Sequence, residues 1–256
     1  MFPGQENGIL DVPACQRPPN AAGEERGAAA IRQKVEIRFE KGEAVRFISH
    51  HDLMRAFQRA VRRAALPVRL TEGFNPRPRI VFPAALEVGI ASLDEAAEIE
   101  LTTWIQPNEL MARLAHHIPP GLTIRGVKEL PSTRKGQTPR RMTYRLHLAE
   151  AGVRLTREML AQALRTPALI FLRMRPDKEK PGKIRTLEVD LKPLVAAAIL
   201  DEDTGVLEVA IAVTPQATAR PLEVLSVLTG TPLEQLKQVR VTKLESLLEP
   251  PPQPPA

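Results

Sequence analysis

Residues 34–42, KVEIRFEKG, and residues 49–66, SHHDLMRAFQRAVRRAAL, decide the fold. The first stretch alternates apolar with charged side chains, which is typical of a β-strand with one buried face. In the second stretch apolar residues recur three and four positions apart, which predicts an amphipathic helix. Ser49 is a good N-cap for that helix, and Asp52 follows it three residues later, where a carboxylate is favoured. Together the two stretches predict the opening of an α+β module.

The residues that follow complete a first module. Apolar patterning predicts strands at residues 79–90 and 95–105, a short helix at 107–118 and a further strand at 122–130. The resulting order is βαββαβ, which is the order of a ferredoxin-like module. We therefore assign residues 33–130 to one such module.

The same pattern restarts after a basic linker at residues 131–141, PSTRKGQTPRR. Two segments of the second copy, residues 192–200 and 241–248, fit either a helix or a strand. The other predicted elements are strands at 143–150, 168–176, 184–191 and 205–215, and helices at 156–166, 220–230 and 232–240. We therefore predict an α+β fold of two tandem ferredoxin-like βαββαβ modules, with residues 142–248 forming the second.

The two ends of the chain differ in composition from the modules. Residues 1–32 are rich in Pro, Gly and Ala without periodicity and predict a disordered leader, and residues 249–256 form a proline-rich tail. No apolar run approaches the roughly 20 residues that a membrane-spanning helix needs, and the first residues lack the pattern of a signal peptide. We expect a cytoplasmic protein without a membrane partner.

Cysteine content limits the chemistry of the chain. Cys15 is the only cysteine, so the chain has no internal disulfide, no cysteine-rich zinc site and no iron–sulfur cluster of its own. The sequence also lacks a P-loop, a GxGxxG motif after a strand and a GxSxG motif. We expect no metal and no cofactor.

The charge of the chain favours an acidic partner. The formal net charge is +6 at pH 7, which suits nucleic acid or an acidic protein surface. At 100° per residue the predicted helix gathers four arginines on the face opposite its apolar residues: Arg55, Arg59, Arg62 and Arg63. A face that is merely soluble normally mixes Glu with Lys, whereas arginine suits bidentate contacts with phosphate. We therefore predict that this arginine stripe binds a partner, against the alternative of a solvated helix surface.

The loop after the helix adds candidate binding residues. In LTEGFNPRPRI, residues 70–80, Gly73 permits a tight turn and two prolines stiffen an extended path. The candidate contacts that this loop contributes are Phe74, Asn75, Arg77 and Arg79. Phe74 could stack on a base or fill the hydrophobic core, and the sequence leaves both open. Further basic clusters occur at 134–141 and 173–185.

Histidines provide the only candidates for catalysis. His50 and His51 lie at the start of the predicted helix beside the arginines, where a histidine could act as general acid or base on a bound RNA. Adjacent histidines lack the spacing of metal ligands. His50 also falls on the apolar side of the helix, which favours a packed or capping role over a catalytic one.

Residues 45–92 resemble the opening of an uncharacterised bacterial family of radical-SAM-linked proteins. The resemblance covers roughly residues 34–245 and is strongest before residue 105. The family motifs S-H-x-D-L-M-R and G-F-N-P-x-P match Ser49, His50, Asp52, Leu53, Met54 and Arg55, and then Gly73, Phe74, Asn75, Pro76 and Pro78. His51 departs from the family pattern, in which this position is more often apolar.

The resemblance implies association with a radical SAM enzyme, to which the family's module is often attached or near which it is encoded. Because this chain has no CxxxCxxC motif, radical chemistry would reside in another chain. The leading hypothesis is a non-catalytic RNA-binding accessory protein that presents RNA to a partner radical SAM enzyme. The alternatives are an adaptor that docks the enzyme through protein contacts alone, and a metal-independent RNA endonuclease.

Overall fold

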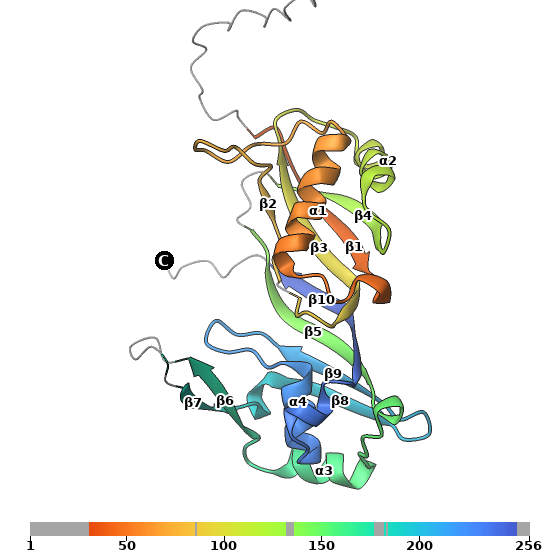
Figure 1. The fold of residues 1–256 in the computed structure, drawn as a ribbon, viewed down its shortest axis with the longest axis vertical. Helices are drawn as coiled ribbons and strands as arrows, with labels where there is room; N and C mark the ends of the chain where they lie inside the picture. The colour runs from red at the N-terminus through yellow and green to blue at the C-terminus, as the bar shows by residue number, and fades with distance from the viewer. Residues whose placement is uncertain (1–30, 85, 132–135, 177–181, 183, 250–256) are drawn as a thin grey trace, which may run out of the picture.

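The structure is a computed structural model that describes residues 31–84, 86–131, 136–176, 182 and 184–249. Almost all of the predicted leader, and the proline-rich tail after Glu249, lie outside the described residues. Figure 1 shows an elongated body in which one sheet continues through both modules.

The first module has the predicted βαββαβ order. Its elements are β1 (Gln33–Lys41), the 3-10 turn η1 (Glu43–Val45), α1 (His50–Arg63), β2 (Ile80–Val81), β3 (Ala91–Leu101), α2 (Pro107–His117) and β4 (Leu122–Leu130). The strands lie in the order β4-β1-β3-β2, and every neighbouring pair is antiparallel. This order is that of a ferredoxin-like module.

The second module repeats the arrangement. Its elements are β5 (Thr138–His147), η2 (Ala149–Ala151), α3 (Arg157–Arg165), η3 (Lys192–Leu194), β8 (Val195–Asp201), β9 (Val206–Ala212), α4 (Pro221–Thr229), the single turn α5 (Leu233–Leu236) and β10 (Arg240–Glu249). The strand order β10-β5-β9-β8 is the same order as in the first module, again with antiparallel neighbours. The predicted α+β fold of two βαββαβ units is thereby confirmed.

A hairpin is inserted into the second module between α3 and β8. Its strands, β6 (Ile170–Pro176) and β7 (Ile184–Asp190), pair only with each other and form a separate two-stranded sheet. Figure 1 shows this hairpin beside the sheet of the second module. We call it the inserted hairpin.

The two modules join through a pair of parallel strands. β10 of the second module pairs with β3 of the first, with Thr242 opposite Ala91 and Lys243 opposite Ser92. The pairing yields one sheet with the path β4-β1-β3-β10-β5-β9-β8. The helices of both modules lie on the same face of this sheet (Figure 1).

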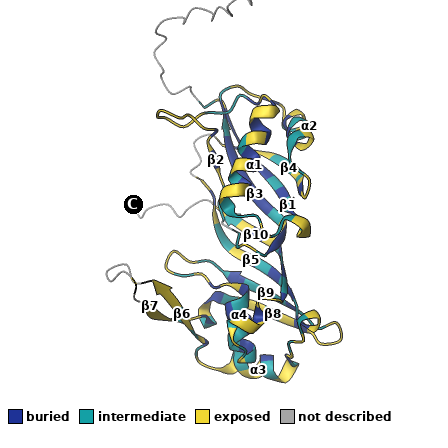
Figure 2. Cartoon of the chain, in the orientation of Figure 1, coloured by how far each residue is buried: buried dark blue, intermediate teal, exposed yellow. Residues whose placement is uncertain are grey.

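Each module has its own hydrophobic core beneath its helices, and buried residues follow the sheet in both halves (Figure 2). In the first, Phe57 of α1 packs on Phe39 of β1 and on Phe82, with ring centroids 4.7 and 5.4 Å apart. In the second, Leu225 of α4 packs with Leu207 and the neighbouring strands. Burial of these apolar faces is the main favourable term in folding and places the polar face of α1 in solvent.

Charged side chains are buried where the two modules meet. Glu95 of β3 and Lys243 of β10 are 2 % and 0 % exposed and form an ion pair of 2.5 Å. Lys41 of β1 is also buried and donates to the carbonyl oxygen of Arg46 at 2.8 Å. Burial lowers the pKa of Lys41, since desolvation disfavours its charged form.

Several predicted elements differ in extent from the structure. The strand predicted at 79–90 is reduced to Ile80 and Val81, because Pro83 has no N–H for a ladder and Gly89 has a φ of +91°. The ambiguous segment 192–200 forms η3 and then β8, and 241–248 is a strand, β10. The helix predicted at 232–240 covers only Leu233–Leu236, and β5 begins at Thr138, within the range assigned to the linker.

Candidate nucleic-acid interface

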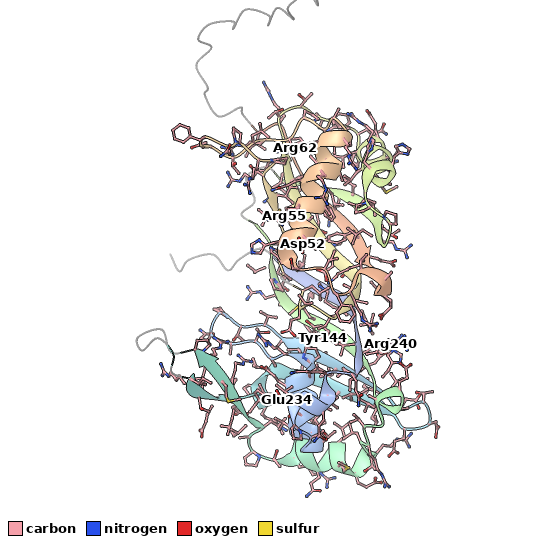
Figure 3. The ribbon with its side chains drawn as sticks, in the orientation of Figure 1. Asp52, Arg55, Arg62, Tyr144, Glu234 and Arg240 are labelled. Atoms are coloured by element: carbon pink, nitrogen blue, oxygen red, sulfur yellow. The ribbon has the colours of Figure 1, made fainter. Side chains whose placement is uncertain are left out.

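The arginine stripe lies on the solvent face of α1. Leu53, Phe57 and Val61 are buried against the sheet, and the opposite face of the helix exposes Arg55, Arg59, Arg62 and Arg63. Figure 3 labels Asp52, Arg55 and Arg62 along α1. The helix therefore presents all four predicted guanidinium groups to solvent.

Little acidic charge neutralises the arginine stripe. Arg55 approaches Asp52 at 3.5 Å, a distance typical of a weak surface pair. Arg59, Arg62 and Arg63 make no ion pair with any residue that the structure describes. An anion that approached these three side chains would not have to displace an internal carboxylate.

The start of α1 has the predicted N-cap. The Ser49 hydroxyl oxygen accepts from the backbone N–H of Asp52 at 3.2 Å, and the hydroxyl lies 2.7 Å from a carboxylate oxygen of Asp52. The hydrogen bond from Ser49, followed by the nearby charge of Arg55, holds the pKa of Asp52 below its usual value. The cap fixes the first turn of the helix and thereby the starting position of the stripe.

The loop after α1 forms a projecting arm, residues 69–79, which Figure 1 shows extending from the module between α1 and β2. The backbone N–H of Thr71 donates to the carbonyl of Arg77 at 2.8 Å, and that of Arg79 donates to the carbonyl of Arg69 at 2.9 Å. Pro78 is buried at the base of the arm. The arm is thus closed by its own backbone hydrogen bonds.

Phe74 lies within the arm and is fully exposed, with a relative accessibility of 105 %. Gly73 precedes it with a φ of +119°, a conformation that a side chain would strain. Asn75 and Arg77 are exposed beside it. Of the two roles that the sequence left open for Phe74, filling the core is wrong, and the ring is available to solvent.

Arg79 differs from the other candidate residues. Its guanidinium lies 3.7 Å from Glu100 of β3, and Arg69 reaches the same carboxylate oxygen at 3.2 Å. Arg79 is still half exposed. Arg79 therefore joins the base of the arm to β3 through Glu100, and it also adds to the positive charge of the arm.

The candidate histidines lie in different surroundings. The half-buried His50 ring packs edge-on against Phe82, with centroids 5.5 Å apart, whereas His51 is exposed. The two rings lie 6.1 Å apart.

Within the described ranges no three His, Cys, Asp or Glu side chains cluster as metal ligands would. No helix there is long and apolar enough to span a bilayer.

The structure connects two residues that sequence analysis did not place beside the stripe. His116 and His117, in the last turn of α2, line a pocket of about 320 Å³ together with Arg59 and Arg63 of α1. The pocket depends on the packing of two helices about 55 residues apart in the chain. The adjacent pair His116 and His117 is visible in the sequence, but adjacent histidines lack the spacing of metal ligands, so local patterns alone assign them no role.

The other basic clusters are partly structural. Arg173 of β6 forms an ion pair of 2.5 Å with Glu223 of α4, and both side chains are largely buried. Arg140 lies 3.3 Å from Glu249. Five further members lie outside the described residues: Arg134, Lys135, Lys178, Lys180 and Lys183. Three exposed members of these clusters, Arg141, Arg175 and Arg185, also make no ion pair with a described residue, but only the arginine stripe gathers such side chains along one helix face.

The fold and this surface define a tandem ferredoxin-like protein with a basic helical face. Residues 34–221 match the model of a family described as uncharacterized protein conserved in bacteria (DUF2344). The chain belongs to that family. No curated protein matches the chain.

Proposed function

We propose that this protein binds single-stranded RNA through the arginine stripe and the arm. Two observations carry the proposal: Phe74 is fully exposed on a closed arm, and Arg59, Arg62 and Arg63 on the neighbouring element α1 have no carboxylate partner among the described residues. Proteins that bind single strands combine a positive groove for the backbone with aromatic rings on which bases stack. A prefolded arm also loses little entropy when it binds.

We further propose that the protein serves as an accessory to a radical SAM enzyme. Support comes from the resemblance of residues 45–92 to the radical-SAM-linked proteins. The chain has a single cysteine, so the [4Fe–4S] cluster of such an enzyme would be held by the partner chain. The accessory would position the RNA, and the partner would perform the radical chemistry.

A pair of charge-reversal variants tests RNA binding. In Arg55→Glu/Arg62→Glu we expect affinity for single-stranded RNA to fall by at least about 30-fold, and the slope of log K against log salt to fall by about 0.7 per lost phosphate contact. The matched control is Arg154→Glu/Arg165→Glu, which changes the same charge at exposed positions of the second module. Fluorescence anisotropy over a salt series provides both numbers, and circular dichroism checks the fold.

The role of Phe74 is tested separately. Phe74→Ala removes one stacking contact, worth about 1–3 kcal/mol, and should weaken RNA binding without changing the salt slope.

For the charge-reversal variants, equal losses of RNA affinity in Arg55→Glu/Arg62→Glu and in its control would mean that only net charge matters. Unchanged affinity in the stripe variant would refute the proposed surface.

The inserted hairpin favours a second candidate, a protein adaptor. Phe171 and Val189 pack on the core of the second module, while the other face of the hairpin exposes Ile170, Leu172, Met174 and Ile184. A row of exposed apolar side chains is typical of a protein-binding surface. Leu172→Asp/Met174→Asp would abolish co-purification with the radical SAM enzyme and leave RNA affinity unchanged if this candidate is correct.

The endonuclease alternative needs a free histidine near bound RNA. The ring of His50 is packed on Phe82, so His51 is the exposed histidine at the start of α1. Incubation of the purified protein with RNA at neutral pH tests this alternative directly. Cleavage that is lost in His51→Ala, with binding retained, would support it over the accessory role.

A further inference from the structure

The pocket between α1 and the end of α2 has an unusual set of side chains. Arg59 and Arg63 reach it from α1, and His116 and His117 reach it from the last turn of α2. The remaining lining is contributed by Ala56 and the segment 118–120, and no lining residue is acidic. Four nitrogen-bearing side chains thus converge on one hollow without a carboxylate among them.

The nearby carboxylates are engaged elsewhere. Glu109 of α2 lies 3.4 Å from Arg113, and Asp52 of α1 is held by Ser49 and Arg55. Arg59 and Arg63 have no ion-pair partner among the residues that the structure describes. The positive charge of the pocket is therefore available to a ligand.

The two helices are fixed relative to one another, so the pocket exists before a ligand binds. Arg113 of α2 donates to the carbonyl oxygen of Ala64 at 2.7 and 3.1 Å and to that of Ala65 at 2.8 Å, at the end of α1. Leu114 of α2 is fully buried in the core beneath both helices. Two consecutive prolines after the helix restrict the backbone on the remaining side.

The number of donors identifies the chemical class of the ligand. Two guanidinium groups offer up to ten N–H donors, and each imidazole adds at least one in either protonation state. An internal phosphodiester has two non-bridging oxygens and a single charge, so it would leave many of these donors unused. A terminal phosphate has three acceptor oxygens and a charge of about −1.5 to −2 at pH 7. The volume of about 320 Å³ lies at the lower end of the range for small-ligand pockets, about 300–1,000 Å³.

We propose that this pocket binds the terminal phosphomonoester of an RNA strand. The proposal rests on the proposed RNA-binding function and deepens it, because Arg59 and Arg63 belong to both the pocket and the arginine stripe. The strand would begin or end at the pocket and continue across Arg55 and Arg62. The histidines would distinguish an RNA end from an internal segment.

The test compares three otherwise identical short oligouridines with an internal fluorophore: one with a 5′-phosphate, one with a 3′-phosphate and one with hydroxyls at both ends. We expect one phosphorylated strand to bind at least about tenfold more tightly than the hydroxyl strand, the equivalent of one charge-assisted hydrogen bond. The strand that is preferred identifies which end the pocket holds.

Variants assign the preference to the pocket. His116→Gln/His117→Gln should reduce it to less than about twofold while affinity for the hydroxyl strand stays the same, because the glutamine amides do not reproduce the positions of the imidazole N–H donors. His51→Gln, an exposed histidine of α1 outside the pocket, should keep the preference. If the histidines only stabilised the end of α2, their replacement would lower stability without changing the preference.

The outcomes separate this proposal from the RNA-binding function on which it rests. Equal affinity of the wild-type protein for all three strands, with binding still lost in Arg55→Glu/Arg62→Glu, would overturn the pocket and keep the function. If no strand binds, the function fails, and inorganic phosphate becomes the probe. Saturable shifts of the His116 and His117 imidazole resonances on adding phosphate would then preserve a phosphate pocket, and their absence would overturn it.

Discussion

The two modules have the same strand order, yet their helices present different surfaces. The first helix of the first module, α1, has four exposed arginines and one aspartate, whereas its counterpart in the second module, α3, has two exposed arginines and one exposed glutamate. Both helices bury an apolar face against the same sheet. The buried faces therefore specify the repeated fold, whereas the exposed faces differ between the modules.

The modules also differ in what is added to them. The first has the arm between α1 and β2, and the second has the inserted hairpin between α3 and β8. Both additions expose large apolar side chains, Phe74 on the arm and Met174 on the hairpin. One molecule therefore offers a basic, aromatic surface at one end and an apolar surface at the other. This division suits a protein that brings an RNA and a protein partner together.

The largest effect that we predict concerns the buried ion pair at the junction between the two modules. We expect this pair to make the two modules unfold together. Glu95→Ala leaves Lys243 and Lys41 buried without their carboxylate, and should lower the free energy of unfolding by about 3–5 kcal/mol. Urea unfolding followed by Trp104 fluorescence in the first module and by far-UV circular dichroism of the whole chain measures the loss.

A half-exposed ion pair provides the control for the junction. Glu208→Ala breaks the pair with Arg145 in the second module and should cost less than about 1 kcal/mol. We expect the Trp104 and circular dichroism transitions of Glu95→Ala to shift together. A loss as small as that of the control would mean that the buried pair contributes little, and separate transitions in the wild-type protein would mean that the modules unfold independently.

A smaller effect is predicted for the inserted hairpin. Arg173→Met removes both side-chain hydrogen bonds from Arg173 to the buried Glu223 and should cost about 2–3 kcal/mol, since the buried carboxylate loses its closest cation and keeps only Arg220. The loss should be local, because the hairpin pairs with no other strand. Hydrogen exchange should accelerate in β6 and β7 and remain unchanged in β1 and β3.

Arg175→Met is the matched control, because Arg175 is an exposed arginine on the same strand. It should leave exchange in the hairpin unaltered. If exchange accelerates equally throughout both modules of Arg173→Met, the hairpin is part of the cooperative unit. In that case the inserted hairpin does not differ in stability from the modules, and the prediction of a separately unfolding insertion is wrong.

Local patterns were sufficient to predict most of the fold. The alternation in β1 and the cap and periodicity of α1 depend only on neighbouring residues, and both elements occur where they were predicted. The extent of β2 and the state of residues 241–248 depend on strand pairing far along the chain. Nothing local shows that β6 and β7 leave the main sheet, because their alternation is that of any strand.

Local sequence patterns likewise predict only part of the candidate site. A helical projection is enough to place the arginine stripe on one exposed face, because the apolar residues determine how α1 faces the sheet. The exposure of Phe74 was undetermined, since an aromatic residue between polar neighbours suits a core as well as an arm. The pocket with His116 and His117 requires α2 to pack beside α1, which only the tertiary structure provides.

The smallest predicted effect concerns the N-caps that start one helix in each module. Ser49 caps α1 and Thr156 caps α3, each accepting from a backbone N–H at 3.2 Å. Ser49→Ala and Thr156→Ala should each cost about 1 kcal/mol in thermal or urea unfolding, because each leaves one helix donor without its partner. Equal costs would mean that helices of the two modules are started by the same local interaction.

RNA affinity then separates the two caps by function. We expect Ser49→Ala to change it by less than about twofold, because the fraying that follows loss of a cap is confined to the first turn and leaves Arg59, Arg62 and Arg63 in the later turns of α1. A much larger loss for Ser49→Ala, with none for Thr156→Ala, would mean that RNA is held mainly at the first turn of α1. Arg55 and His51 would then replace the later arginines as the centre of the interface.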